Sequence, residues 1–498
     1  MNGSGRADAA AVAGEHRAAL DALAADLSGG TPRDDGSWRP VVDAALVRPG
    51  DPAYDDARTV WNGAVEAYPA AVAYAGDEDD VVRVVEMARG TGLGVAVRSG
   101  GHSVAGASTC DGGLVLDCSR LTGVEVDPEA GAATVKPGAT LGDVDGATRA
   151  HGLATPLGVV PDTGATGLTL GGGTGYLTRA HGLACDRLTR IDLVTADGER
   201  VTASDDANPD LFRALRGGGG NFGVAVELAF DLVDLDHGVA TCDAWYRFGD
   251  DAHAAGLLRA YRDLLADADR GTNVSPYAAV VPEGEGFPAD AVGDLALCFL
   301  GVHAGDPDRG EAELRPYRRL DDDALLADRA ERMDYLDLQS LLADGSPQGD
   351  RYYWKSVTVP ALTDDLVDLT VERMRSMPGD RDTVVVWPLG GAVADLEPDE
   401  TAIPARGERD VVLNFEASWT DPAADDAHVG WARGSVAAVR EVVDGPELPN
   451  FAGTETGEAA ARAVFGDNHG WLRDVKTAWD PEDVFGPSGR LSPWPQSR

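Results

Sequence analysis

Lysine is almost absent from this chain of 498 residues, which contains only Lys136, Lys355 and Lys476. Lysine and arginine together number 42, against 84 aspartates and glutamates, and the formal net charge is −42. Because a surface this negative repels phosphate backbones, we expect no nucleic-acid partner. Extreme acidity helps a folded chain to stay soluble in concentrated salt, so we expect a halophilic protein.

Long hydrophobic runs and paired cysteines are also missing. No run approaches about 18 apolar residues, so we expect no membrane span and no membrane partner. The first residues lack the basic and apolar regions of a secretory signal, which predicts a cytoplasmic protein. The five cysteines are scattered without a CxxC pair. This pattern argues against a disulfide framework and a structural zinc site, and we expect no metal; the oligomeric state stays open.

The order of apolar segments predicts an α+β chain of two domains. Residues 1–40 are expected to form a helical lead-in, and residues 41–234 a first domain of short strands and helices. Composition shifts near Asp234, and we expect residues 235–445 to form a second domain, an antiparallel sheet flanked by helices. Residues 446–498, rich in glycine, aromatic residues and proline, are expected to return to the first domain.

Alternation and helical periodicity predict the individual elements. The expected strands are residues 71–75, 94–98, 114–117, 124–127, 133–136, 191–196, 199–203, 224–230, 295–303, 352–359, 383–387 and 411–419. The expected helices are residues 78–89, 141–151 and 471–478. Asp197-Gly198, between two of these strands, predicts a hairpin.

Three glycine-rich loops stand near the ends of expected strands. They are RSGGHS at residues 98–103, LGGGTG at residues 170–175 and GGGGNFG at residues 217–223. Glycine lets the backbone approach a ligand closely, so that consecutive N–H groups converge on an anion. The three loops together predict a large phosphorylated cofactor. None has the context of a Rossmann or P-loop motif, which excludes those two assignments.

The longer segments RSGGHSVAG, DGGLVLDCSRL, LGGGTGYLTRAHGLACDRL and RGGGGNFGV carry a family resemblance. They resemble the FAD-linked oxidases of the berberine-bridge-enzyme-like group, in the vanillyl-alcohol-oxidase/p-cresol-methylhydroxylase (PCMH) superfamily. The resemblance runs from about residue 60 to residue 490 and implies a two-domain PCMH-type FAD-binding fold. It also implies a covalent bond from the imidazole of His102 to the flavin 8α-methyl group. Many relatives carry a second, cysteinyl tether where this chain has Val160, so a singly attached flavin is implied.

The matched motifs imply which residues contact FAD. In the tail, Asn468 matches the Asn of an Asn-Tyr pair in relatives and is a candidate for contacting the isoalloxazine, with His469 in place of the usual Tyr. The full predicted set is Arg98, Ser99, Gly100, Gly101, His102, Ser103, Gly106, Gly167, Leu170, Gly171, Gly172, Gly173, Gly175, Asp186, Gly220, Asn221, Phe222, Gly223, Val224 and Asn468.

The strand expected at residues 411–419 offers a candidate base. Its even-numbered residues form a mostly polar face that includes Asn414 and Glu416. The resemblance implies that the position of Asn414 faces the substrate and is Glu or Gln in relatives. An amide does not act as a base, so Glu416 on the same face is the candidate. The alternative is a solvated outer face of a half-exposed sheet.

Tyr353 and Lys355 form a second candidate pair on one strand face. An ammonium beside a phenol favours the phenolate, so we expect Lys355 to lower the pKa of Tyr353. The alternative is an ion pair between Lys355 and a surface aspartate.

These features predict an FAD-dependent enzyme that oxidises an alcohol, a sugar hydroxyl or an amine by hydride transfer to flavin. The expected partners are a small-molecule substrate and O₂, which would be reduced to H₂O₂. One alternative is a dehydrogenase that uses another electron acceptor. The other is a flavin-binding protein without turnover, which the lack of a base at Asn414 favours.

Overall fold

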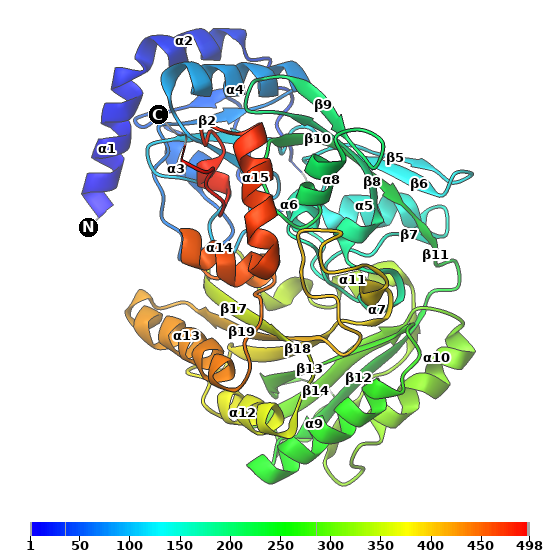
Figure 1. The fold of residues 1–498 in the computed structure, drawn as a ribbon. Coiled ribbons are helices and arrows are strands. Elements are labelled where there is room, and N and C mark those ends of the chain that lie inside the picture. Colours follow the sequence, from blue (N-terminus) through cyan, green and yellow to red (C-terminus); the bar gives the residue numbers. More distant parts are fainter. Residues whose placement is uncertain (1, 35, 285, 496–498) are drawn as a thin grey trace.

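Short, mostly apolar strands build two small sheets in the upper half of the molecule (Figure 1). The computed structural model describes residues 2–34, 36–284 and 286–495. The first sheet has the order β1-β2-β4-β3, and its β2, β4 and β3 run parallel. Its strands are β1 (Leu46–Val47), β2 (Ala71–Tyr74), β3 (Val95–Arg98) and β4 (Leu114–Asp117). Between β2 and β3 runs α4 (Glu78–Thr91), capped by the Asp77 carboxylate, which accepts from the backbone N–H of Asp80.

The second sheet of this half is antiparallel and has the order β5-β6-β10-β8-β9. Its strands are β5 (Val124–Asp127), β6 (Ala132–Val135), β8 (Leu188–Val194), β9 (Arg200–Ala203) and β10 (Val224–Asp231). The predicted hairpin at Asp197-Gly198 joins β8 to β9, and Gly198 has a φ of +79°. A short pair, β7 (Leu153–Ala154) with β11 (Val233–Asp234), lies beside it.

A large antiparallel sheet forms the lower half (Figure 1). Its order is β15-β12-β14-β13-β18-β19-β17, with β16 also paired to β12. Its strands are β12 (Val239–Arg247), β13 (Thr272–Val280), β14 (Leu295–His303), β15 (Leu325–Asp328), β16 (Arg332–Met333), β17 (Arg351–Val359), β18 (Thr383–Pro388) and β19 (Val411–Trp419). These strands lie inside the segment predicted as the second domain.

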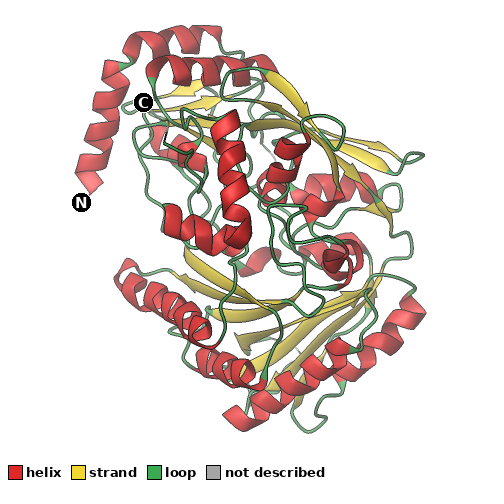
Figure 2. Ribbon diagram, viewed as in Figure 1, coloured by secondary structure: helices red, strands yellow, loops and turns green. Residues whose placement is uncertain are grey.

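Helices cover one face of the large sheet and leave the other face toward the upper half (Figure 2). The covering helices are α9 (Asp251–Ala266), α10 (Pro307–Leu314), α12 (Asp364–Arg375) and α13 (Asp425–Val442). Side chains of α9, α12 and α13 share one buried apolar cluster with the odd-numbered residues of β19, such as Leu413 and Phe415. The even-numbered residues of β19 therefore point toward the space between the halves.

The lead-in and the returning tail both pack in the upper half, where Leu20 and Phe485 share one buried apolar cluster. The lead-in forms α1 (Asn2–Glu15) and α2 (Arg17–Asp26), and α14 (Glu458–Phe465) and α15 (His469–Trp479) lie against the upper half (Figure 1). Lys476 on α15 donates to the backbone oxygen of Asn221 in the third glycine loop and forms an ion pair with Asp480 at 2.7 Å. The remaining helices are α3 (Tyr54–Arg58), α5 (Leu141–Arg149), α6 (Ala165–Leu170), α7 (Thr178–His181), α8 (Pro209–Leu215) and α11 (Tyr335–Ser340). In the described ranges, no helix is both long and apolar enough to cross a bilayer.

Candidate active site

A cavity of about 820 Å³ lies between the two halves. Glycine loops form its upper wall, and β13, β18 and β19 form its lower wall. Asn273 of β13 joins the walls, because its amide donates to the backbone oxygens of Gly175 and Tyr176. This volume is near the upper end of the ~300–1,000 Å³ range of ligand pockets. The cavity therefore has room for a large ligand.

The glycines allow the loops of the upper wall to meet at van der Waals distance. A Cβ on Gly100 would lie 2.3 Å from the backbone nitrogen of Gly164, and a Cβ on Gly175 would lie 2.0 Å from the oxygen of Leu157. Side chains at these positions would push the loops apart. The predicted cofactor residues that line the cavity are Ser99, Gly100, Gly101, His102, Ser103, Gly167, Leu170, Gly171, Gly175, Gly220, Asn221 and Gly223.

Eight predicted cofactor residues do not line the cavity, although several support its walls. Arg98 is buried, pairs with Asp117 at 2.8 Å and donates to two backbone oxygens. Asp186 pairs at 2.7 Å with the buried Arg406. Both side chains form ion pairs inside the protein and therefore stabilise the loops and strand ends around the cavity. The eight predicted cofactor residues outside the cavity lining are Arg98, Gly106, Gly172, Gly173, Asp186, Phe222, Val224 and Asn468.

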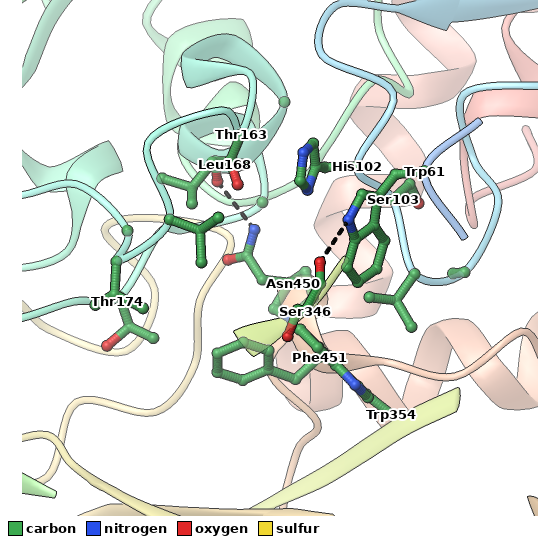
Figure 3. A pocket seen from close by; sticks show the side chains of 18 of the residues that line it. Trp61, His102, Ser103, Thr163, Leu168, Thr174, Ser346, Trp354, Asn450 and Phe451 are labelled. Atoms are coloured by element: carbon green, nitrogen blue, oxygen red, sulfur yellow. Dashed lines mark hydrogen bonds between the residues drawn. The ribbon is translucent and has the colours of Figure 1, made fainter. Parts of the chain in front are cut away.

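Asn450, and not Asn468, is the tail asparagine at the cavity. The Asn468 amide donates to Pro398 at 2.7 Å and to Thr401, away from the cavity. Asn450 accepts from the backbone N–H of Gly173 at 2.8 Å and donates to Leu168 (Figure 3). It thereby holds the second glycine loop against the returning tail. The only sequence signal for Asn450 was its place at the start of that tail.

His102 faces the cavity from the first glycine loop (Figure 3). Its ring stacks on Trp61, with centroids 5.0 Å apart and planes 20° apart. Its Nε2 lies 3.2 Å from a carboxylate oxygen of Asp162, and the Trp38 indole N–H points at the same nitrogen from 3.4 Å. Both contacts use Nε2, and neither Asp162 nor Trp38 contacts Nδ1. Sequence reasoning missed Trp61, Trp38 and Asp162, because no motif marks them.

Glu416 reaches the cavity from β19, on the face opposite the helices. It stands beside Trp354 of β17 in the strand register. The Asn414 amide donates to its carboxylate at 2.6 Å. Burial raises the pKa of Glu416 to about 8, and the Asn414 hydrogen bond opposes that rise only in part. Glu416 thus faces an interior cavity, whereas Asn414 beside it is buried without lining the cavity, and neither lies on the solvated outer surface that was the alternative.

Tyr353 and Lys355 lie on the other face of the sheet, and neither lines the cavity. The Lys355 ammonium is engaged by Glu447 at 2.9 Å and Glu455 at 3.1 Å. The Tyr353 hydroxyl donates to Glu455 and accepts from Arg433. Burial, with the Glu455 hydrogen bond, raises the pKa of Tyr353. The expectation that Lys355 lowers this pKa was wrong, because the ammonium is neutralised by two carboxylates.

Aromatic and aliphatic side chains dominate the lower wall. Its apolar members come from the sheet and from the tail. They are Tyr277, Leu300, Trp354, Val385, Trp387 and Phe451. The lining also includes the charged Asp380, Arg381 and Asp382, just before β18, so the wall combines apolar surface with a few polar groups that can orient a small ligand.

Comparison with known proteins places these features in a family. A family model described as an FAD binding domain matches residues 69–204, and one described as berberine and berberine like matches residues 449–487. The first covers His102 and two of the glycine loops, and the second covers Asn450. The chain thus contains an FAD binding domain and a berberine-like segment, the two features by which it resembles the berberine-bridge-enzyme-like FAD-linked oxidoreductases. The resemblance seen in the sequence is thereby confirmed, and with it the assignment as an enzyme.

Relatives cover nearly the whole chain. The (R)-6-hydroxynicotine oxidase of Paenarthrobacter nicotinovorans is 28% identical, over 91% of this chain and 97% of its own length. The solved 6-hydroxy-D-nicotine oxidase of Arthrobacter nicotinovorans is 25% identical, with a TM-score of 0.76 over 90% of this chain and 98% of that one. These matches confirm the PCMH-type α+β fold.

A third relative carries a covalent flavin. Glucooligosaccharide oxidase of Acremonium strictum, solved with a 6-S-cysteinyl, 8α-N1-histidyl FAD, is 24% identical to this chain. Its TM-score is 0.79, over 90% of this chain and 96% of that one.

The cavity in this chain fits FAD, the cofactor named by the matching domain model. Ser108 and Thr166 line it, and their buried side-chain oxygens have no hydrogen-bond partner among the described residues. Buried polar atoms left unpaired are costly, and the hydroxyl or phosphate oxygens of a bound FAD would satisfy them. The glycine loops would hold the phosphates with backbone N–H groups, and His102 lies on the same cavity wall.

Proposed function

We propose that the protein holds FAD through one covalent bond, from His102, and oxidises a C–OH or C–N bond of a small molecule. The candidate substrates are alcohols, sugar hydroxyls and amines, with O₂ as the electron acceptor. When bound, the flavin would accept the hydride, and O₂ would then be reduced to H₂O₂. The Nδ1 of His102, which Asp162 leaves without a contact, supports the single tether, as does Val160, where a second tether would need a thiol.

The position of Glu416 carries this proposal. Removing a hydride from a C–OH or C–NH group requires that the O–H or N–H proton has an acceptor. Glu416 offers a carboxylate on the cavity wall, oriented by the Asn414 amide. A general base works best when its pKa lies near the working pH, and the pKa of Glu416, about 8, is close to neutral pH. This arrangement weighs against a flavin-binding protein without turnover, the alternative that rested on the missing base at position 414.

The apolar lower wall narrows the substrate class. Trp354, Trp387 and Phe451 present flat aromatic surface to the same cavity as the Glu416 carboxyl group, and Phe451 packs against both tryptophans. Such surface binds a compact ring, either an alicyclic or aromatic amine or alcohol or the apolar face of a sugar. We expect the best substrates to have one polar group to be oxidised on a largely apolar ring.

A substrate screen without oxygen tests the proposal. Cyclic amines, aromatic alcohols and sugars are mixed with the holoenzyme, and bleaching of the flavin absorbance is followed. Bleaching by a member of these classes is expected. The alternative of a dehydrogenase is then judged in air, where peroxide formed in step with substrate marks an oxidase. No bleaching by any of these compounds would refute the proposed substrate classes.

We also propose that the acidic surface suits the protein to concentrated salt. Ion pairs such as Arg318 with Asp328 and Arg351 with Asp425 engage many basic groups. The 84 acidic residues still outnumber the 42 basic ones, so unpaired carboxylates repel one another. The Debye length grows from about 3 Å at 1 M salt to about 30 Å at 0.01 M, which unscreens that repulsion.

The melting temperature is therefore expected to fall as KCl is lowered from about 1 M to about 0.01 M. Exposed ion pairs become stronger at low salt, but each stabilises the fold by only about 0–1 kcal/mol. The repulsion among the surplus carboxylates is therefore expected to outweigh this gain. Calorimetry across a KCl series measures the effect, and a matched sucrose series controls for general solvent exclusion. A melting temperature that stays flat across the KCl series would refute the adaptation.

A further inference from the structure

The loop at residues 160–164 carries a carboxylate to the tether histidine. Asp162 stands at its tip, with one oxygen 3.2 Å from Nε2 of His102. The residues on both sides are pinned to the start of α5, because Leu141 donates to Thr163 at 2.9 Å and Gly142 donates to Pro161 at 2.8 Å. The Asp162 carboxylate is thus held in place by backbone hydrogen bonds on either side.

The charge of Asp162 decides which ring nitrogen carries the proton. Burial alone would raise the pKa of this carboxyl, but the hydrogen bond from His102 and the nearby positive charges lower it below its usual range. An ionised carboxylate accepts a hydrogen bond and does not donate one, so Nε2 must carry the proton. A neutral imidazole protonated at Nε2 has its lone pair on Nδ1.

Trp38 makes the competing contact. Its indole N–H lies 3.4 Å from Nε2 and would favour the opposite tautomer, with the lone pair on Nε2. The Asp162 contact is shorter and involves an ionised acceptor. Charge-assisted hydrogen bonds are roughly twice as strong as neutral ones. The carboxylate therefore prevails, and Nδ1 is the nucleophile.

We propose that Asp162 is the positioning residue for covalent attachment of the flavin, because it holds the His102 proton on Nε2 and so directs the Nδ1 lone pair at the cofactor. This inference rests on the proposed tether. A bond forms between Nδ1 and the flavin 8α-carbon, and a C–H bond at that carbon breaks and releases its proton. The electron pair of that C–H bond reduces the flavin ring, and O₂ then reoxidises it and becomes H₂O₂. The imidazole becomes cationic in this step, and the carboxylate at Nε2 stabilises that charge.

The test separates covalent attachment from binding. Wild type and the variants Asp162→Asn, Asp162→Glu and Trp38→Phe are produced without riboflavin and mixed with FAD in air. Quenching of flavin fluorescence gives the affinity for noncovalent FAD. Flavin retained on acid-precipitated polypeptide, with the mass increase of the intact chain, gives the rate of attachment.

Asp162→Asn is expected to bind FAD with the wild-type affinity and to attach it about 10²-fold more slowly, the lower end of what a positioned proton acceptor contributes. Asp162→Glu is expected to recover part of the rate. Trp38→Phe is expected to attach flavin at least as fast as wild type, because the competing donor is gone.

Three results would overturn the inference. The first is a wild-type rate in Asp162→Asn, the second is loss of noncovalent FAD binding together with attachment, and the third is an equal defect in Trp38→Phe. The last two would assign the loop a merely structural role. Wild-type protein that never retains flavin would instead refute the tether itself, which keeps the two failures distinct.

Discussion

Glu416→Gln is expected to slow anaerobic flavin reduction by about 10²–10⁴-fold, the usual contribution of a general base. Glutamine fills the same space and can still pair with Asn414, but it does not accept the substrate proton. Stopped-flow absorbance of the holoenzyme, mixed with a substrate found in the screen, measures the rate. The flavin spectrum of the variant should match that of wild type.

The pH dependence adds a signature that loss of packing would not produce. With the pKa of Glu416 raised to about 8, the ionised base is the minor form at neutral pH. The wild-type reduction rate should therefore rise with pH and level off above about 8. In Glu416→Gln this rise should be absent. A pH profile that is unchanged in the variant would show that another group limits the rate.

Tyr353→Phe is the matched control. It removes one hydroxyl from the neighbouring strand, on the face covered by helices. Because Tyr353 does not line the cavity, flavin reduction should proceed at the wild-type rate. A large defect in Tyr353→Phe combined with a small one in Glu416→Gln would contradict the assignment of the base and restore the Tyr353–Lys355 hypothesis.

His102→Ala is expected to remove the covalent flavin completely. Acid-denatured wild-type protein should keep its yellow colour and flavin fluorescence on the polypeptide, whereas the variant should release all of its FAD into solution. The reason is that, in the proposal, the imidazole of His102 forms the only bond to the cofactor. The second position used by doubly linked relatives is Val160, which has no nucleophile.

The measurement is the flavin content of washed, acid-precipitated protein, supported by the mass of the tryptic peptide that contains residue 102. His151→Ala serves as the control, because His151 is exposed at the end of α5 and is not among the residues that line the cavity. It should keep the covalent flavin. Wild-type protein whose flavin washes off would contradict the tether, and a flavin kept by His102→Ala would point to another residue.

The sequence by itself determined the local structure and the chemistry of the motifs. Alternating apolar residues placed the strand at Val411–Trp419, because a strand turns every second side chain to the same face. That periodicity was enough to put Glu416 and Asn414 together. Glycine-rich runs likewise identified the loops at Gly100 and Gly171, because close backbone approach requires the loss of the side chain.

The tertiary structure alone decided which groups meet across large sequence separations. Asp162 reaches His102 across 60 residues, and Asn450 reaches Gly173 across 277 residues. The same holds for Glu455, which pairs with Lys355 from 100 residues away and so removes that lysine from the chemistry. Periodicity and motif spacing report only on neighbours along the chain. Contacts between the returning tail, the loops and the large sheet depend on how buried surfaces pack, and no local pattern in the sequence encodes that packing.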